Sequence, residues 1–270
     1  MKKVTITIPT YNSEKTLRTT LQSVKDQTYE DIEISVVDSH SKDKTCEIAK
    51  EFGATVYQYE GTLLGARGEG VKRANGDYIL LLDSDQVLEK TTIARAVELM
   101  KEYDMLWLYE RSYYVKTTLD RLYDADRELI QKHAVDFIMP VGGTILPRFY
   151  KKEILVKAFS QMPKEILPLC VAHDHAIIYY EARKNSEKIG KLDNAIWHIE
   201  PQGWINLFKK TYRYGKTTKK LVKNNAYVEI IQSKNKMRKF YSEDYGLWFK
   251  SNILRVARGI PYKLGYYFER

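Results

Sequence analysis

An α/β fold with a mainly parallel sheet is predicted, because short apolar runs alternate with helical patterns along the first hundred residues. Residues 4–8 form an apolar run of strand length, and residues 13–24 carry apolar side chains at helical spacing after Ser13, a candidate N-cap. Residues 32–37 repeat the strand pattern before a helix expected at 43–52. This alternation indicates parallel strands joined by right-handed crossovers.

The remaining elements extend this architecture and then become mixed. A short strand is expected at 55–59, a helix at 63–74 closed by Asn75-Gly76, and a buried strand at 78–82. Later patterns predict helices at 91–103, 119–133 and 176–182, and strands at 105–109, at 144–150 and ending at His198. We expect one sheet domain over residues 1–203, with halves 1–100 and 101–203, followed by a helical appendage at 204–270.

Composition restricts the class of protein. No apolar run approaches the roughly 18 to 20 residues of a membrane-spanning helix, and the N-terminus enters a strand without a signal-peptide pattern. We therefore expect the body of the chain to fold in the cytosol. Cys46 and Cys170 have no metal-binding spacing and are expected to be reduced.

The net charge of +9 is concentrated at one end of the chain. Residues 204–270 hold 16 Lys or Arg and 4 Asp or Glu, a net +12, which leaves −3 for residues 1–203. Such asymmetry indicates an anionic partner for the C-terminal quarter, either a nucleic acid or an anionic membrane surface.

Two aspartates one residue apart carry the clearest chemical signal. Asp83 and Asp85 directly follow the apolar run 78–82. Carboxylates at this spacing suit a hard divalent cation, which shares oxygen ligands with a diphosphate. A plain strand-end turn is the alternative, because Asp and Ser favour turns. Residues 9–12 and 38–41 also follow strands, and ligands bind at the carboxyl ends of strands in such sheets, so the three loops are expected to meet at one crevice.

Four motifs, taken together, resemble those of the family 2 glycosyltransferases. They are residues 8–12 (IPTYN), residues 36–45 (VVDSHSKDKT), Gly65-Ala66-Arg67 with residues 74–78 (ANGDY), and Asp83-Ser84-Asp85. The resemblance is close over residues 3 to about 100 and can be followed to about 215. It implies the GT-A fold, a Rossmann-like sheet that binds nucleoside diphosphate sugars, and inverting transfer of a sugar to an acceptor hydroxyl or phosphate.

On the donor side, the resemblance assigns contacts with the nucleotide base and ribose to Pro9, Tyr11 and Asp38. A helix-loop cap is the alternative role for Asp38. Arg67 resembles the family's basic residue before the metal-binding strand, and a guanidinium suits bidentate contact with a diphosphate or a neighbouring carboxylate. A solvated helix charge is the alternative for Arg67. Ser84 is grouped with the same nucleotide-sugar site.

For the cofactor, the resemblance implies Mn²⁺ or Mg²⁺ with Asp85 as a direct ligand and Asp83 at the ribose or at a metal-bound water. Several relatives carry a histidine at the position of His198 that approaches the diphosphate or completes the metal shell, and neutral imidazole binds Mn²⁺. A buried structural histidine is the alternative.

On the acceptor side, Gly142, Gly143 and Arg148 resemble the family's acceptor-binding residues, although a structural tight turn also explains the glycines. Asp174 matches the position of the general base, which takes the proton of the attacking hydroxyl. The family often has Glu before this aspartate, and this chain has His173 instead.

The C-terminal segment interleaves aromatic and basic residues, a pattern typical of a helix that lies in a membrane interface. Many relatives use polyprenyl phosphates or other lipid-linked acceptors. We therefore expect a lipid-linked or glycan acceptor and peripheral binding at the cytoplasmic face of an anionic membrane. Packing of the aromatics onto the sheet domain or a dimer partner is the alternative. Arg213 is a weaker candidate for phosphate binding.

Two other classes of protein are considered. Nucleotidyl transfer also uses an α/β sheet and an aspartate-bound metal, but residues 9–12 lack its Gly-rich, basic signature. A nucleic-acid-binding protein would explain the basic tail but not the acidic strand ends, so no nucleic acid is expected. Within the glycosyltransferases, similarity to dolichyl-phosphate mannose synthase-like enzymes favours GDP-mannose slightly over a UDP-hexose.

Overall fold

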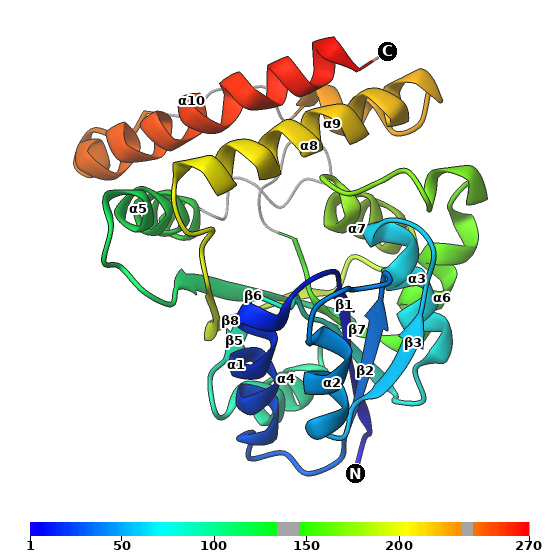
Figure 1. The fold of residues 1–270 in the computed structure, drawn as a ribbon. Helices are drawn as coiled ribbons and strands as arrows, with labels where there is room; N and C mark the ends of the chain where they lie inside the picture. The colour runs from blue at the N-terminus through cyan, green and yellow to red at the C-terminus, as the bar shows by residue number, and fades with distance from the viewer. Residues whose placement is uncertain (134–145, 234–239, 270) are drawn as a thin grey trace.

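The computed structural model describes residues 1–133, 146–233 and 240–269. These residues form a mixed sheet of eight strands in the order β3-β2-β1-β4-β7-β6-β8-β5 (Figure 1). The strands β3, β2, β1 and β4 are parallel, β7 is antiparallel to both of its neighbours, and β6 and β8 are parallel. In chain order, the strands are β1 (Val4–Thr10), β2 (Ile32–Asp38), β3 (Thr55–Gln58), β4 (Tyr78–Leu81), β5 (Gln86–Leu88), β6 (Met105–Ser112), β7 (Phe149–Lys151) and β8 (Ile189–His198).

Helices cover both faces of this sheet. One apolar core contains side chains of α1 (Glu14–Lys25), α2 (Thr45–Glu51) and α4 (Thr92–Leu99), and the other contains side chains of α3 (Leu63–Arg73), α6 (Lys152–Gln161) and α7 (Asp174–Arg183). The strand β4 supplies both cores: Leu80 belongs to the first, and Ile79 and Leu81 belong to the second. This is the alternation of a strand that is buried on both faces.

A separate helical layer lies beyond the carboxyl ends of the parallel strands (Figure 1). It consists of α5 (Thr118–Lys132), α8 (Trp204–Lys223), α9 (Val228–Ser233) and α10 (Tyr245–Phe268), and α10 packs along both α8 and α5. Two short 3-10 helices, Lys164–Ile166 and Ser242–Asp244, lie in connecting segments. In the described part of the chain, none of the helices combines the length and the apolar character needed to cross a membrane.

Two glycines allow α8 and α10 to approach closely. A β-carbon on Gly215 would lie 2.0 Å from the carbonyl oxygen of Tyr262, and one on Gly265 would lie 2.0 Å from that of Tyr212. No residue with a side chain fits at either position without moving a backbone. Near the other end of the pair, Leu207 of α8 and Leu254 of α10 join a small apolar cluster with α5.

The sequence predicted the alternating first half well, and the differences lie farther along. The strand β5 and the helix α6 were not predicted, because three residues are too few for a periodic signal and α6 directly follows β7. The strand expected at 144–150 is observed as Phe149–Lys151, and its first two residues lie outside the described residues. The strand that ends at His198 begins at Ile189, and the helix at Trp204 continues to Lys223. Neither Cys46 nor Cys170 is part of a disulfide within the described residues, as expected.

Candidate active site

A cleft of about 640 Å³ lies between the loops at the carboxyl ends of the strands and the helical layer. It is where three polar strand ends were expected to meet. Most of the predicted site residues line it, namely Pro9, Tyr11, Arg67, Asp83, Ser84, Asp85, Arg148, Asp174, His198 and Arg213. Gly142 and Gly143 lie outside the described residues.

The loop that carries the paired aspartates is fixed by hydrogen bonds from three directions. The backbone N–H of Asp83 donates to the side-chain oxygen of Gln86 at 2.9 Å, and the hydroxyl of Thr20 donates to the carbonyl of Ser84 at 3.0 Å. The hydroxyls of Ser13 and Ser84 lie 2.9 Å apart, which ties this loop to the one after β1. Ser13 is the N-cap residue of α1, but its hydroxyl makes no capping bond to that helix.

Asp83 is held between two arginines from different elements. One carboxylate oxygen binds the guanidinium of Arg67 on α3, and the other accepts a 3.0 Å hydrogen bond from Nη1 of Arg148, just before β7. Burial alone would raise the pKa of Asp83, but the two arginines hold it well below its usual range. Asp83 is therefore a carboxylate at neutral pH with both of its oxygens engaged.

Asp85 and His198 are brought together by strand pairing. Gln86 of β5 lies opposite His198 of β8, and the N–H of Ile199 donates to the carbonyl of Asp85 at 2.8 Å. Nε2 of His198 then lies 3.6 Å from Oδ1 of Asp85. Ligand atoms of Asp83, Asp85 and His198 all lie within 4.8 Å of one another. Two carboxylates and an imidazole form a donor set that suits Mn²⁺.

Arg67 also reaches the predicted general base. Its side chain is 1% exposed, and its Nε donates to Oδ2 of Asp174 at 2.6 Å. Burial would raise the pKa of Asp174, but the charge of Arg67 brings it below its usual range. The contact expected for Arg67, with a diphosphate or a neighbouring carboxylate, is made here with the carboxylates of Asp83 and Asp174. Within the described residues, Nη1 of Arg67 has no hydrogen-bond partner.

The two histidines that flank Asp174 have separate partners. Nε2 of His173 lies 3.0 Å from the hydroxyl of Thr218 on α8, away from the acidic pair. His175 lines the cleft, with Nε2 2.7 Å from Nη1 of Arg148. Burial, together with Arg148, lowers the pKa of His175 to about 4, so the ring is neutral at pH 7 and accepts this bond. The side chains of His173 and His175 therefore do not converge on one point. This agrees with their spacing, because residues i and i+2 at the start of a helix face different directions.

A chain of alternating charges runs from Asp83 through the floor of the cleft, and the sequence analysis did not find it. Nε of Arg148 donates to Glu110 at 2.6 Å, Glu110 accepts from Arg127 at 2.6 Å, and Arg127 donates to Glu200 at 2.8 Å. Glu200 lies two residues after His198, and His198 lies beside Asp85. The series of charges therefore leads from Asp83 back to Asp85, the other member of the acidic pair. A charged residue directly after the apolar run 105–109, as at Glu110, was the available signal.

Asp38 takes the role that was given as its alternative. It is fully buried, it accepts from the hydroxyl of Thr10 at 2.8 Å, and it accepts from the N–H of Ser41 at 2.8 Å. Burial would raise the pKa of Asp38, but its hydrogen bonds with Ser41 and Thr10 lower it. Asp38 thus caps the loop after β2, while Ser39 and Tyr11 face the cleft, Tyr11 with 56% of its surface exposed. Contact of Asp38 with a nucleotide stays a prediction.

The helical layer gives the cleft a cationic wall. Lys210 and Arg213 on α8 and Arg258 on α10 line it. Lys210 lies near Tyr214 and Asp85, and the attraction of these groups raises its pKa. Among the described residues, neither Lys210 nor Arg213 has a carboxylate within 4.0 Å, so both ammonium and guanidinium are free to face an anion. Helices after residue 203 form part of the same cleft. The division of the chain into domains at that residue stays a prediction.

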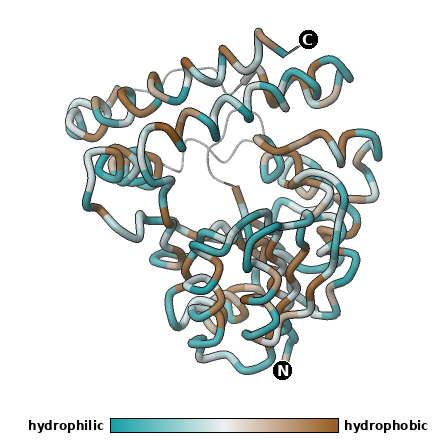
Figure 2. Tube along the Cα trace, in the orientation of Figure 1, coloured by the Kyte–Doolittle hydropathy of each residue, from teal (hydrophilic) through white to brown (hydrophobic). Residues whose placement is uncertain are grey.

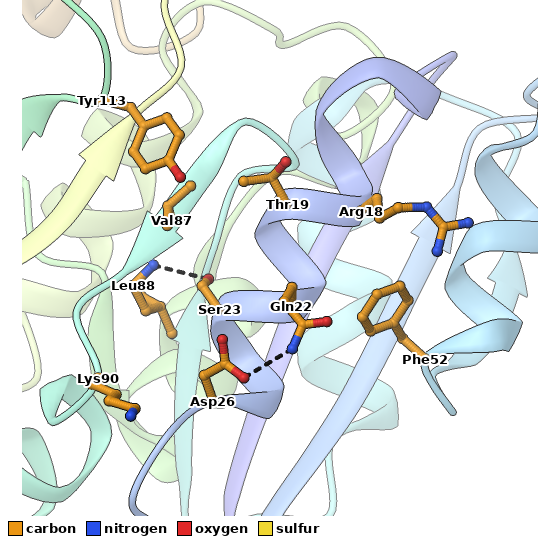
Figure 3. Close-up of a pocket in the computed structure, with 10 residues that line it drawn as sticks. All are labelled: Arg18, Thr19, Gln22, Ser23, Asp26, Phe52, Val87, Leu88, Lys90 and Tyr113. Atoms are coloured by element: carbon orange, nitrogen blue, oxygen red, sulfur yellow. Dashed lines mark hydrogen bonds between the residues drawn. The ribbon is translucent and has the colours of Figure 1, made fainter.

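A second hollow, of about 540 Å³, lies beside α1 and has a different character (Figure 3). Its polar groups are paired locally: the N–H of Leu88 donates to Ser23 at 3.0 Å, and Gln22 donates to Asp26 at 2.8 Å. The guanidinium of Arg18 lies over the ring of Phe52. No buried charged groups converge there, so we place the active site in the larger cleft.

An eight-stranded mixed sheet with an acidic pair at the carboxyl end of β4 defines the GT-A class, and comparison with known structures agrees. Staphylococcus aureus TarS (residues 1–349, in complex with UDP-GlcNAc) superposes with a TM-score of 0.57 at 17% identity, covering 98% of this chain and 90% of that one. The mannosyltransferase PcManGT of Pyrobaculum calidifontis, in complex with GDP-Man and Mn²⁺, gives 0.56 at 15% identity, covering 98% and 73%. At these identities the likeness establishes the fold alone.

Residues 5–163 match glycosyl transferase family 2. The match covers more than half of the chain, which therefore belongs to that family. Among curated relatives, glycosyltransferase GlyA of Streptococcus pneumoniae is 36% identical over 107 residues, which cover 37% of this chain and 15% of GlyA. WfaP of Escherichia coli, a UDP-Glc:α-D-GlcNAc-diphosphoundecaprenol β-1,3-glucosyltransferase, is 32% identical over 121 residues, which cover 43% of this chain and 48% of WfaP. The chain spans less than two thirds of the length of these relatives.

Proposed function

We propose that this protein is a metal-dependent, inverting glycosyltransferase that moves a hexose from a nucleoside diphosphate sugar to a hydroxyl or phosphate acceptor. The observation that carries the proposal is the grouping of Asp85, His198 and the Arg67–Asp174 pair around one cleft. Asp85 and His198 would hold Mn²⁺ or Mg²⁺, and Arg67 and Asp174 would act on the reacting groups. The same arrangement would be unusual for a structural ion pair, because Asp85 faces the cleft and, in the described residues, no Lys or Arg nitrogen lies within 4.0 Å of its carboxylate.

The donor would lie across the carboxyl ends of β1 and β4. Pro9, Tyr11 and Ser84 would line the nucleotide side, and Asp38 would act by holding the loop of Ser39 in place. Asp85 and His198 would hold the metal, with Asp83 beside them. A bound divalent cation would neutralise the diphosphate and stabilise the charge that develops as it leaves. The free Nη1 of Arg67 and the ammonium of Lys210 would supply further positive charge to the same group.

In the transfer step, the acceptor oxygen attacks the anomeric carbon from the face opposite the diphosphate. The new carbon–oxygen bond forms as the bond to the diphosphate breaks, and the diphosphate leaves with the bonding electron pair. For a hydroxyl acceptor, the proton passes to the carboxylate of Asp174, which the charge of Arg67 keeps ionised at neutral pH. Arg148 would position the acceptor, together with Gly142 and Gly143.

The helical layer supports an acceptor that carries phosphate and lipid. Lys210 and Arg213 present unpaired positive charge to the cleft, and Arg213 was the predicted phosphate contact. On α10, apolar side chains form one exposed stripe opposite the buried residues Ser251, Leu254 and Gly265. We call this the α10 stripe; its members, each 37% to 74% exposed, are Tyr245, Phe249, Ile253, Val256, Ile260, Leu264 and Tyr267.

An exposed apolar stripe of this length is typical of a helix that lies in a membrane interface. Figure 2 shows apolar segments recurring along α10 between hydrophilic ones. Lys250 and Lys263 are exposed on the same helix, and the C-terminal quarter carries the excess positive charge. We therefore propose peripheral binding to the cytoplasmic face of an anionic membrane. We also propose a lipid-linked acceptor, because the name of WfaP gives an acceptor linked to diphosphoundecaprenol.

Thermal melting with a panel of ligands tests the donor and the metal together. The panel contains UDP, GDP, UDP-hexoses and GDP-mannose, each with Mn²⁺ and with EDTA. GDP-mannose was slightly favoured by the sequence, and the donors named for relatives include both nucleotides. A ligand that binds only the native state raises the melting temperature. We expect one nucleotide to do so only with metal, and Asp85→Ala to remove the shift. No shift with any nucleotide would refute the proposal.

A further inference from the structure

Two buried polar atoms face each other beside the candidate metal site, and neither has a hydrogen-bond partner among the residues that the structure describes. They are Nδ1 of His198 and Oε2 of Glu200, which lie 3.7 Å apart. The gap is about 0.5 Å longer than the longest ordinary N–H···O hydrogen bond. Burying a polar group without a partner destabilises the folded state, so two such groups side by side need a reason.

The other atoms of both side chains are already committed. Oε1 of Glu200 accepts from Nε of Arg127 at 2.8 Å, which fixes the carboxylate with its second oxygen toward His198. Nε2 of His198 points to Asp85 at 3.6 Å. His198 is the last residue of β8 and Glu200 follows two residues later, and the chain brings the two side chains to the same side.

This arrangement matches what a metal-binding histidine needs behind it. An imidazole binds a metal through one nitrogen only when the proton is on the other, and a carboxylate that accepts that proton's hydrogen bond fixes both the tautomer and the ring orientation. Glu200 is 4% exposed, and its Oε1 accepts from Arg127, which leaves Oε2 as the oxygen that faces His198. It is therefore an acceptor at the correct place.

We propose that Glu200 is the positioning residue for His198: its Oε2 accepts from Nδ1–H and holds Nε2 toward a divalent cation shared with Asp85. The inference rests on the metal site of the proposed function. The chain of alternating charges gives Glu200 a wider role. Arg127 binds both Glu200 and Glu110, and Glu110 in turn binds Arg148. Both carboxylates of the acidic pair are thus fixed by one network, Asp83 through Arg148 and Asp85 through His198.

The experiment measures Mn²⁺ affinity of the full chain without nucleotide, from the electron paramagnetic resonance signal of free Mn²⁺. Glu200→Gln keeps the size of the side chain and an oxygen for Arg127. We expect it to weaken Mn²⁺ binding about 10- to 100-fold, the usual effect of removing the carboxylate behind a metal-binding histidine. Glu181→Gln is the matched control, because Glu181 is also buried, at 2% exposed, but binds Lys184 and Tyr227 away from the cleft. We expect it to leave Mn²⁺ affinity unchanged.

A double-mutant cycle separates positioning from a general loss of structure. In a His198→Ala background there is no imidazole to orient, so Glu200→Gln should weaken Mn²⁺ binding no further. Equal losses in both backgrounds, or wild-type affinity in Glu200→Gln, would overturn the inference while leaving the metal site in place. If the wild type and all variants fail to bind Mn²⁺, the metal site of the proposed function is wrong and the inference falls with it.

Discussion

Nε of Arg67 donates a 2.6 Å hydrogen bond to Oδ2 of Asp174, and the two residues are 107 positions apart in the chain. The same guanidinium binds Asp83, so one buried cation joins the candidate base to the acidic pair. In the proposed reaction, this contact would fix the acceptor and the leaving-group sides of the cleft relative to each other. Catalysis by positioned groups depends on such fixed geometry, because small displacements of a reacting group reduce the rate greatly.

Asp174→Asn should abolish most of the transfer activity and spare donor binding. The amide keeps the shape of the side chain but cannot take the proton of an acceptor hydroxyl, so we expect a loss of about 10²- to 10⁴-fold in turnover. The nucleotide-dependent rise in melting temperature should remain. Asp104→Asn is the control, because Asp104 also sits in an ion pair, with Lys151, far from the cleft. Wild-type turnover in Asp174→Asn would exclude Asp174 as the base for that acceptor.

Substitution of the two aspartates of the acidic pair should have different effects, on stability for Asp83 and on Mn²⁺ binding for Asp85. Asp83→Asn leaves Arg67 and Arg148 without their shared carboxylate, and breaking a buried ion pair costs roughly 3 to 5 kcal/mol. Asp85→Asn breaks no arginine contact and should instead weaken Mn²⁺ binding with little change in stability. Urea unfolding and Mn²⁺ titration of both variants give the comparison. Equal effects on both quantities would contradict this division of roles.

The first half of the fold and its loops could be predicted because their signals are local. A strand, a polar turn and a helix follow one another within about 20 residues, and Asp83 and Asp85 are visible as a pair in the sequence itself. The reduced state of the two cysteines follows from their spacing in the same way.

The charge chain could not be predicted, because its members come from elements whose pairing is set by tertiary structure. Glu110 lies on β6, Arg127 on α5, Arg148 before β7 and Glu200 after β8. Their contacts depend on the register of β6 with β8 and on the antiparallel insertion of β7, neither of which periodicity encodes. For the same reason, the sequence could not tell that both oxygens of Asp83 bind arginines, whereas in the described residues Asp85 binds none.

Stability should fall in acid through Glu110. Burial would raise the pKa of Glu110, but Arg148 and Arg127 lower it to about 2, against an ordinary value of 4.5. A lowered carboxylate pKa stabilises the folded state above pH 4.5, and this stabilisation is lost as pH falls from 4.5 to about 2. The shift corresponds to about 3 kcal/mol. The free energy of unfolding in urea, measured without metal, should therefore depend less on pH in Glu110→Gln over this range. An unchanged slope would contradict the prediction.

The contact between α8 and α10 should depend on its two glycines. Gly215→Ala and Gly265→Ala each place a β-carbon 2.0 Å from a carbonyl oxygen of the other helix, and overpacking of this kind costs about 1 to 3 kcal/mol or more. Gly246→Ala and Gly259→Ala are controls on α10, where a β-carbon meets no atom within 4 Å. Alanine favours the helix at those positions, so the controls should be neutral or stabilising. Thermal unfolding that ranks all four alike would refute this account.

Membrane binding should depend on the α10 stripe and on anionic lipid. Wild-type protein is expected to float with vesicles that contain phosphatidylglycerol and less with vesicles of phosphatidylcholine alone, because apolar burial and positive charge act together in interfacial binding. The double substitution Phe249→Gln and Ile260→Gln removes two exposed apolar side chains from the stripe. Since burial of each contributes on the order of 1.5 to 3 kcal/mol, we expect the fraction bound to fall more than tenfold.

The matched control for this prediction removes two apolar side chains of similar exposure elsewhere. Val115 and Val156 are 45% and 44% exposed and lie outside the C-terminal segment, so Val115→Gln with Val156→Gln should leave flotation unchanged. Equal losses in both double variants would mean that no particular face meets the lipid. If the wild type binds neither kind of vesicle, the α10 stripe is covered by protein, and sedimentation equilibrium should then reveal a self-associated chain that the stripe substitutions dissociate. A monomer that binds no vesicle would exclude both explanations of the stripe.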